Sequence, residues 1–416
     1  MKATGKIKTW ILNFPFWIMM FFTIFHLGVY VRFYIGERQV SFSWVNQVAS
    51  LGYVCAVYLW ALWINQKNYI KIVSILMGIL SFCGIVLSLN GSRGSVNDVL
   101  FAGTAVLTIF YVFENAQYLS ELVKKLDAVL AVAIWMFVGF TVVLFVFFPD
   151  YQTQWGAGTF LFGHRFASVC SLAIMLIGLK LTNSPKHKAV YWAMMIVYYY
   201  LCFWTGARIY MISNLGQLYA MLFVFRKNNK DFIIKCIAVT LVAVMAFFTT
   251  SASAKFENII EITNNSLEEK AEQNELVDES YEWSNAISNG RVSIWTNCIE
   301  TYANLPLGNK LIGSGNSYVY TVTVQGAYAH TDFLNILFFN GLIGLLVYLV
   351  VFLGYVGYYW HSNKLPIIVL IGFWGIWFVL ALLNGYGNYT ADMMSLPYMS
   401  VLALWDKNNQ KTAKKQ

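Results

Sequence analysis

The chain carries little charge for its length. Only 12% of its 416 residues are Asp, Glu, Lys or Arg, whereas soluble domains carry about 25%. Hydrophobic residues make up 58% of the sequence, and 18% of the residues are aromatic. This balance excludes an ordinary soluble protein and predicts an all-α, polytopic membrane protein.

Patterns that hold metals or disulfides are also missing. The six cysteines show no CxxC spacing, and the sequence has no DxD, HxH or HExxH motif. We therefore predict neither a disulfide framework nor a metal site, and we expect no cofactor. The cysteines are predicted to be packing residues.

No internal repeat, low-complexity tract or soluble domain interrupts the chain. Instead, the sequence contains twelve apolar stretches, most of them long enough for the roughly 17–25 residues that a membrane-spanning helix needs. The first is not followed by a small-x-small cleavage site, so we expect an uncleaved anchor. The predicted spans are about 10–30, 44–64, 70–89, 99–118, 128–148, 166–181, 189–206, 209–225, 233–250, 333–358, 366–384 and 389–405.

The predicted spans place most lysines and most arginines on opposite sides of the membrane. With both termini on the cytoplasmic side, almost all lysines lie inside, where cations orient a membrane protein. Orientation thus explains the net charge of +8 without a nucleic-acid partner. The outer segments instead hold six of the seven arginines: Arg32, Arg38, Arg93, Arg165, Arg208 and Arg291. Because arginine grips phosphate oxygens with a planar fork, this placement indicates an anionic ligand outside.

The pattern divides the chain into four parts. Residues 1–250 are predicted to hold spans one to nine, and residues 251–331 a large extracytoplasmic loop. Residues 332–405 would hold spans ten to twelve, and residues 406–416 a basic cytoplasmic tail.

The two halves of the large loop differ. The first half, 256–282, is acidic and contains helix-forming runs, so a solvated disordered tether and an ordered helix both stay open. In the second half, Val292, Trp295, Ile299 and Tyr302 recur at helical spacing and predict an amphipathic helix. The sequence Leu305-Pro306-Leu307-Gly308 is expected to end that helix, and Gly313-Ser314-Gly315 to form a turn.

Three outer arginines are candidates for anion binding. Arg208 lies in a tight turn after Thr205-Gly206, Arg291 opens the amphipathic helix, and Arg165 follows His164 at the start of a short span. That short span, preceded by glycine-rich sequence, suggests a broken helix that lines a cavity. The alternative for each arginine is an ordinary contact with lipid head groups or water.

His330 and Asp332 stand where the tenth span enters the membrane. Histidine titrates near neutral pH and is the commonest general base. The face beyond it carries Gly341 and Gly344, which allow close helix packing. Asp332 is a candidate helix cap or a support for the histidine.

Three more ionisable residues lie inside predicted spans. Asp392, near the outer face, is a candidate partner for one of the arginines. Glu114 lies near the cytoplasmic end of its span, where it either snorkels or has a function, and His26 is a further candidate.

Three sequence elements resemble the superfamily of O-antigen ligases and Wzy-type polysaccharide polymerases. Thr205-Gly206-Ala207-Arg208 resembles the family turn "[ST]-[GS]-S-R", although Ala207 replaces the serine. Gly290-Arg291 with Trp295 and, further on, Pro306-Leu307-Gly308 and Gly313-Ser314-Gly315 resemble the family loop. From His330 to Gly344 the chain is similar to "H-N-x-[FY]-L-x-x-L-x-x-x-G-x-x-G", with Thr331 in place of the asparagine.

This resemblance implies a metal-independent glycosyltransferase similar to the GT-C type, acting outside the cytoplasmic membrane of a bacterium. A glycan on a polyprenyl diphosphate would be the donor. Arg208 and Arg291 would bind the diphosphate, with Arg165 as a further contact, and His330 would be the catalytic base. Asp332, Asp392 and His164 would support them.

The resemblance leaves the reaction open among related activities. A polymerase for a capsule, exopolysaccharide or O-antigen is the leading hypothesis, and a ligase that moves finished glycan to another acceptor is the alternative. A flippase for lipid-linked oligosaccharides is disfavoured, because transporters usually show an internal repeat. Expected partners are the bilayer, lipid-linked donor and acceptor glycans, a chain-length regulator and a flippase.

Overall fold

The computed structural model describes residues 2–29, 32–35, 38–41, 43–88, 96–147, 163–183, 186–272, 278–288, 290–314, 329–363 and 367–383. The predicted twelfth span, the basic tail, Arg93 and Asp392 lie outside these residues. The elements of the first half are α1 (Lys2–Val29), β1 (Arg32–Ile35), β2 (Arg38–Ser41), α2 (Ser43–Leu59), η1 (Trp60–Ile64), α3 (Asn68–Ser88), α4 (Val96–Glu114), α5 (Ala116–Lys125), α6 (Asp127–Phe147), α7 (Gly163–Thr182), α8 (Lys188–Trp204) and α9 (Arg208–Val224). Those of the second half are α10 (Asn229–Thr249), α11 (Ser251–Glu272), α12 (Glu279–Ile287), α13 (Arg291–Ala303), α14 (Leu307–Ile312), α16 (Asp332–Asn363), α17 (Ile367–Leu370), η2 (Ile371–Gly375) and α18 (Ile376–Leu383).

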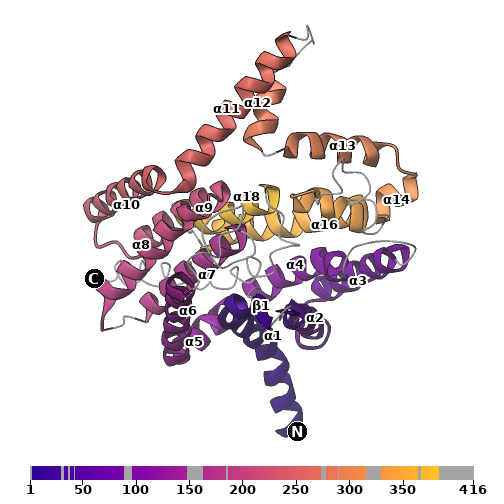
Figure 1. The fold of residues 1–416 in the computed structure, drawn as a ribbon. Helices are drawn as coiled ribbons and strands as arrows, with labels where there is room; N and C mark the ends of the chain where they lie inside the picture. Colours follow the sequence, from indigo (N-terminus) through magenta and orange to yellow (C-terminus); the bar gives the residue numbers. More distant parts are fainter. Residues whose placement is uncertain are drawn as a thin grey trace.

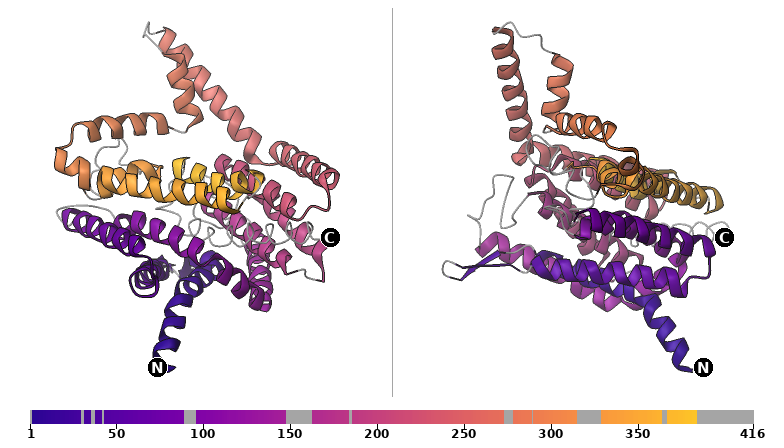
Figure 2. Two further views of the ribbon diagram at one scale, coloured as in Figure 1. Left: turned by 180° about the vertical axis from the view of Figure 1, so that it is seen from behind. Right: turned by 90° about the vertical axis from the view of Figure 1, so that its right-hand side faces the viewer.

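The described chain is therefore almost entirely helical, with one two-stranded antiparallel hairpin, β1–β2. The long helices pack into one body, and α11 and α12 project from it as an arm (Figures 1 and 2). A Lys270–Glu282 ion pair of 2.5 Å joins the two arm helices. The acidic half of the large loop is thus helical where it is described, which favours the ordered alternative.

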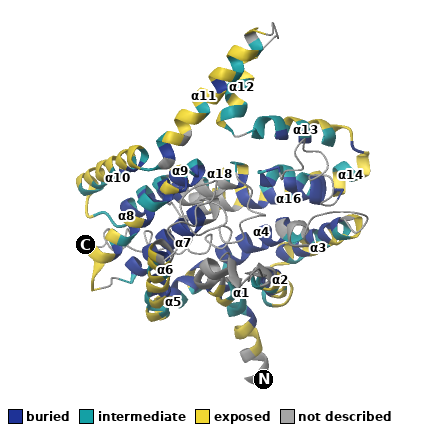
Figure 3. Cartoon of the chain, viewed as in Figure 1, coloured by how far each residue is buried: buried dark blue, intermediate teal, exposed yellow. Residues whose placement is uncertain are grey.

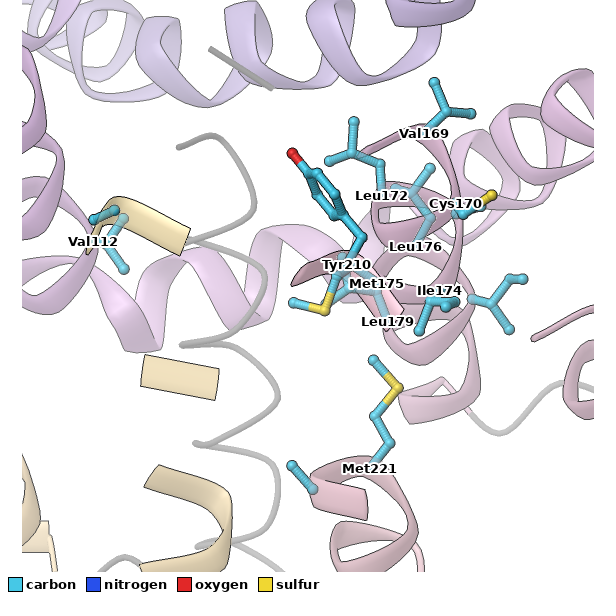
Figure 4. Packing of buried hydrophobic residues seen from close by; sticks show 14 of the residues in the cluster. Val112, Val169, Cys170, Leu172, Ile174, Met175, Leu176, Leu179, Tyr210 and Met221 are labelled. Carbon is cyan, nitrogen blue, oxygen red and sulfur yellow. The ribbon is translucent and has the colours of Figure 1, made fainter. Parts of the chain in front are cut away.

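Helix α7 forms the centre of the body. Nearly every side chain from Phe166 to Leu181 is buried, because α7 packs against α1, α6, α8 and α9. A helix that is apolar on all sides belongs in such an interior. Figure 4 shows its Val169, Cys170, Leu172, Ile174, Met175, Leu176 and Leu179 beside Tyr210 and Met221 of α9. The helix runs without a break from Gly163, so the broken helix predicted at this span is not found in its described part.

Helix α10 presents an apolar face to the outside of the body (Figure 3). Its Ile234, Leu241 and Phe248 are 63%, 63% and 71% exposed. Such a surface is unfavourable in water and suits the hydrocarbon of a bilayer. The exposed face therefore supports a membrane environment.

Three described segments are long and apolar enough, by length and composition, to cross a membrane: Asn68–Leu87, Asn229–Thr249 and Asp332–Gly354. The third has a non-helical backbone at Gly341, so only the first two are unbroken helices. The bent pair Ala116–Lys125 and Asp127–Val143, at 75°, passes the same test together. These helices confirm an all-α membrane protein in outline, while the number of twelve spans stays a prediction.

Two ion pairs tie helix ends at the predicted cytoplasmic side. Glu114, one of the ionisable residues predicted inside a span, pairs with Lys67 at 2.6 Å. Lys180 is nearly buried and pairs with Asp127, the first residue of α6, at 2.6 Å. Both contacts join neighbouring helices, so we assign Glu114 a structural role.

Helix α16 folds back on itself at Gly341. The backbone there is non-helical, with φ +70°. In a straight helix, the fifteen steps from Phe333 to Tyr348 would cover about 22 Å. The two ring centroids lie only 6.2 Å apart. Asp332–Asn340 is therefore a half-helix beside the residues that follow, not the start of one straight span as predicted.

The turn at Gly341 accommodates the backbone of the outer loop. A Cβ at Gly341 would lie 2.2 Å from the Leu311 carbonyl oxygen, and one at Gly313 would lie 2.3 Å from the Phe339 carbonyl oxygen. The Ser314 amide also donates to the Phe338 carbonyl at 2.8 Å, near the end of the half-helix. Gly341 thus does allow close packing, and its partner is the C-terminal end of α14 in the large outer loop.

The predicted amphipathic helix exists as α13. Trp295 and Tyr302 pack against a small core that includes Ile294, Cys298 and Phe338. Ile299, which the spacing placed on the buried face, is 57% exposed, because that face is centred on Ile294 and Cys298. All six cysteines are free, and Cys170, Cys202 and Cys298 are buried packing residues.

Candidate active site

Arg291 stands at a sharp corner between α12 and α13. Gly290 makes the corner with φ +78°, and its amide donates to the Asn285 carbonyl at 2.7 Å. The Asn285 side chain then accepts from the Ser293 amide at 3.1 Å, and the Ser288 hydroxyl accepts from the Val292 amide at 3.3 Å. Two side chains from α12 therefore satisfy amides in the first turn of α13, which fixes the position of Arg291.

The guanidinium of Arg291 is half-buried and reaches the end of another helix. It donates a hydrogen bond to the carbonyl of Leu383, the last residue of α18. A carbonyl at the C-terminal end of a helix carries partial negative charge and suits such a donor. This contact holds the cation next to the bundle instead of in open solvent.

His330 lies just before the half-helix in a strained backbone conformation. Its φ of +52° makes it the sole described residue other than glycine with a positive φ. The Ala329 carbonyl accepts from the Trp295 indole N–H at 2.8 Å, and the Thr331 carbonyl accepts from the Asn335 amide at 3.2 Å. The histidine is thus held by bonds on both sides, and such strain often marks a functional site.

The imidazole of His330 is kept neutral. Burial, and secondarily the positive charge of Arg291, lower the pKa of His330 from 6.5 to about 4. The structure therefore brings these two residues together, although 39 positions separate them in the sequence. At neutral pH the imidazole is uncharged and able to accept a proton.

Asp332 begins the half-helix and is completely buried. Its carboxylate acts electrostatically on Tyr348, which follows the fold at Gly341. The residue therefore connects the two parts of α16, and its predicted support of His330 stays a prediction.

Arg208 begins α9 after a tight turn, as the sequence predicts. Gly206 has φ +63°, and the Thr205 hydroxyl donates to the Cys202 carbonyl at 2.7 Å and accepts from the Ala207 amide at 3.1 Å. Arg208 is half-buried. Its helix, α9, packs against α18. The last residue of α18, Leu383, accepts the hydrogen bond from Arg291, so α18 contacts both the helix of Arg208 and the side chain of Arg291.

The remaining candidates are less well placed. His164 and Arg165 lie in the first turn of α7, but their side chains lie outside the described part of the structure. The same holds for His26 in α1. Leu383 and Asn285 could not be recognised from the sequence, because neither carries a charge. Leu383 lies 92 positions after Arg291, and Asn285 lies on the preceding helix, α12. For Trp295, the spacing of four residues from Arg291 was a usable signal, since it places both on one side of a helix.

These features define a helical membrane protein in which Arg291 lies close to the imidazole of His330, next to the half-helix that begins α16. Comparison with known families narrows this class, since residues 193–349 match the model of the family described as O-antigen ligase. This part of the chain is therefore identified as O-antigen ligase-like, which confirms the resemblance seen in the sequence. No curated protein matches the chain.

The matched part includes Arg208, Arg291 and His330 but neither Arg165 nor Asp392. The family consists of membrane enzymes of glycan assembly that transfer glycosyl groups in a broad sense. It implies lipid-linked glycan substrates. Together with the apolar helices, the match indicates that the chain is a multi-pass membrane protein.

Proposed function

We propose that the chain is a polysaccharide polymerase that joins repeat units carried on polyprenyl diphosphate, at the outer face of a bacterial cytoplasmic membrane. The observation that carries this proposal is the pairing of a neutral His330 with the cation of Arg291. Glycosyl transfer from a diphosphate uses both a base and a cation. The acceptor hydroxyl loses a proton to the base, and the departing diphosphate gains negative charge that the cation stabilises.

In the proposed reaction, His330 accepts the proton of an acceptor hydroxyl. The hydroxyl oxygen forms a bond to the anomeric carbon of the donor glycan, and the bond from that carbon to the diphosphate oxygen breaks. The electron pair leaves with the diphosphate, whose charge Arg291 and Arg208 stabilise with bidentate hydrogen bonds. Arg165 would be a further diphosphate contact.

Other parts of the assignment rest on the sequence and are proposed with it. They include the support of the site by Asp332, Asp392 and His164, the cytoplasmic termini, the four-part division at 250, 331 and 405, and the GT-C-like topology. A chain-length regulator and a flippase are the proposed protein partners. Since α11 begins at Ser251 and α16 at Asp332, the helix boundaries are compatible with the proposed limits of the large loop.

The alternative activity is that of a ligase. Both reactions use the same donor and the same leaving group, so the Arg291–His330 pair fits either of them. They differ in the acceptor, which is another lipid-linked glycan for a polymerase and a different molecule for a ligase.

The test is a size-resolved profile of lipid-linked glycans in cells that lack the chain. Single repeat units that accumulate on lipid at the outer face support a polymerase. Long chains that stay on lipid indicate a ligase, and single units confined to the cytoplasmic leaflet indicate a flippase. Complementation with the wild-type chain should restore the polymer, whereas His330→Ala, present at the same level in the membrane, should not.

A further inference from the structure

One hydrogen bond connects the helix that carries Arg291 to the residue before His330. The indole N–H of Trp295 donates to the Ala329 carbonyl oxygen at 2.8 Å, across 34 positions of sequence. Trp295 is half-buried, and its ring packs against a core in which Ala329 and Phe338 are fully buried. The bond therefore lies in a well-packed region.

The Ala329 carbonyl belongs to the same planar peptide group as the His330 amide nitrogen. A bond that fixes the direction of this carbonyl also fixes the orientation of the whole peptide plane. The φ angle of His330 is the rotation about the N–Cα bond that leaves this plane. That angle is +52°, a conformation that residues with a Cβ rarely adopt. Such a conformation persists only where the surroundings determine it, and the Trp295 bond is a contact that does so.

Trp295 follows Arg291 by four residues on α13, so the two side chains lie on the same side of one helix. Helix α13 thus carries the cation on its first residue, Arg291. Its fifth residue, Trp295, contacts the peptide group before His330. A change in the Trp295 contact would alter the position of the imidazole relative to the guanidinium without altering either group.

We propose that Trp295 is a positioning residue that orients the His330 imidazole toward Arg291 by holding the peptide plane between Ala329 and His330. This inference rests on the proposed function for its kinetic consequence. The geometric part, which concerns the environment of His330, is independent of the reaction.

The decisive variant is Trp295→Phe, which keeps an aromatic ring and removes the N–H donor. Replacing Trp295 by benzothienylalanine, in which sulfur stands in place of the N–H, preserves the bicyclic shape as well. The matched control is Tyr302→Phe, on the same helix. It removes the hydroxyl that donates to the Lys310 carbonyl at 2.6 Å, away from His330.

With lipid-linked repeat units as substrate, we expect both Trp295 variants to lower kcat by about 10²-fold while KM for the donor stays within a factor of about 2. The acid limb of the pH–kcat/KM profile, which reports the free enzyme, should move up from near pH 4, because a mobile imidazole regains contact with water. Tyr302→Phe should keep the wild-type profile. Wild-type kcat and pH profile in both Trp295 variants would overturn the proposal.

A second measurement separates this inference from the proposed function. The pKa of the His330 imidazole is followed by NMR of histidine-labelled protein in nanodiscs, with the signal assigned from its loss in His330→Gln. The charged group that acts on it is Arg291 on α13. On α16, Asp332 follows it by two residues and acts on Tyr348, while α18 carries no charged or titratable residue. Trp295→Phe should raise this pKa toward 6.5 even if the chain proves not to be a polymerase. An unchanged pKa would contradict the positioning role, whereas full activity of His330→Ala would contradict only the proposed catalysis.

Discussion

The proposed reaction places two requirements on the small region that holds Arg291 and His330. The diphosphate needs a permanent positive charge, and the acceptor hydroxyl needs a base that is not already protonated. Burial is the main reason that the pKa of His330 is low, and the positive charge of Arg291 lowers it further. The cation that binds the anion therefore also helps to keep the base unprotonated.

Replacing Arg291 by lysine tests whether its geometry matters in addition to its charge. A lysine keeps the charge but loses the planar fork that binds two diphosphate oxygens, so we expect kcat/KM to fall by about 10²-fold or more. The matched control is Arg226→Lys. Arg226 follows the C-terminal end of α9, opposite to the end that carries Arg208, and stacks on the Phe223 ring at 3.5 Å. Lysine weakens this stacking but leaves the candidate site unchanged, so kcat/KM of the folded protein should stay near the wild-type value. Near-normal turnover by Arg291→Lys would indicate that the arginine only contacts lipid or solvent.

The pH dependence of the reaction follows from the environment of His330. Its pKa of about 4 in the ligand-free protein means that kcat/KM should stay constant from neutral pH down to about pH 5 and decrease below it. The unfolded chain binds a proton on this residue near pH 6.5, so the free energy of unfolding should also decrease as the pH falls from 6.5 to 4. His330→Gln should weaken that decrease. A kinetic pKa near 6.5 in the wild-type protein would contradict the buried environment.

At the scale of elements, the fold of α16 depends on a backbone that only glycine adopts readily. Gly341→Ala places a Cβ at φ +70° and about 2.2 Å from the Leu311 carbonyl oxygen. We expect a loss of at least about 2 kcal/mol of stability, measured as unfolding in detergent. Gly354→Ala, later in the same helix and with nothing within 4 Å of its Cβ, should change stability by no more than about 1 kcal/mol. Equal effects of the two substitutions would mean that the fold at Gly341 is not required.

The elements also show what sequence patterns could and could not predict. The turn from Thr205 to Arg208 and the helix from Arg291 were predictable, because a glycine, a polar cap and a periodic apolar face mark them locally. The fold at Gly341 was not predictable, since the segments on both sides of it are mostly apolar and hydropathy is the same for a straight and a folded helix. Its cause is a contact with Leu311, which local patterns do not contain.

The same limit applies to the candidate site. Arg208, Arg291 and His330 were recognisable because the sequence holds few arginines and only five histidines, and these three lie at the predicted outer ends of spans or of the amphipathic helix. The partners that orient them are a carbonyl of Leu383, an amide side chain of Asn285 and the indole of Trp295. These groups are common in any sequence, so only the folded chain identifies them.

At the scale of the whole molecule, charge follows the predicted sides of the membrane. The arm of α11 and α12 is rich in Glu, and it projects from the body, as Figure 2 shows from two further directions. The turn between α9 and α10 carries Arg226 and Lys227. Anionic lipids attract basic segments and repel acidic ones, so these two regions are expected on opposite sides.

Labelling of single introduced cysteines tests this arrangement. Glu268 lies exposed on α11, and Lys227 lies exposed in the turn after α9. We expect Glu268→Cys to react with a membrane-impermeant maleimide in intact spheroplasts, and Lys227→Cys to react only after permeabilisation. The parent chain gives the background from its native cysteines, three of which are buried. The opposite pattern would place Arg291 and His330 at the cytoplasmic leaflet, where nucleotide-linked sugars and not finished lipid-linked units would be the natural donors, and the polymerase proposal would then be wrong.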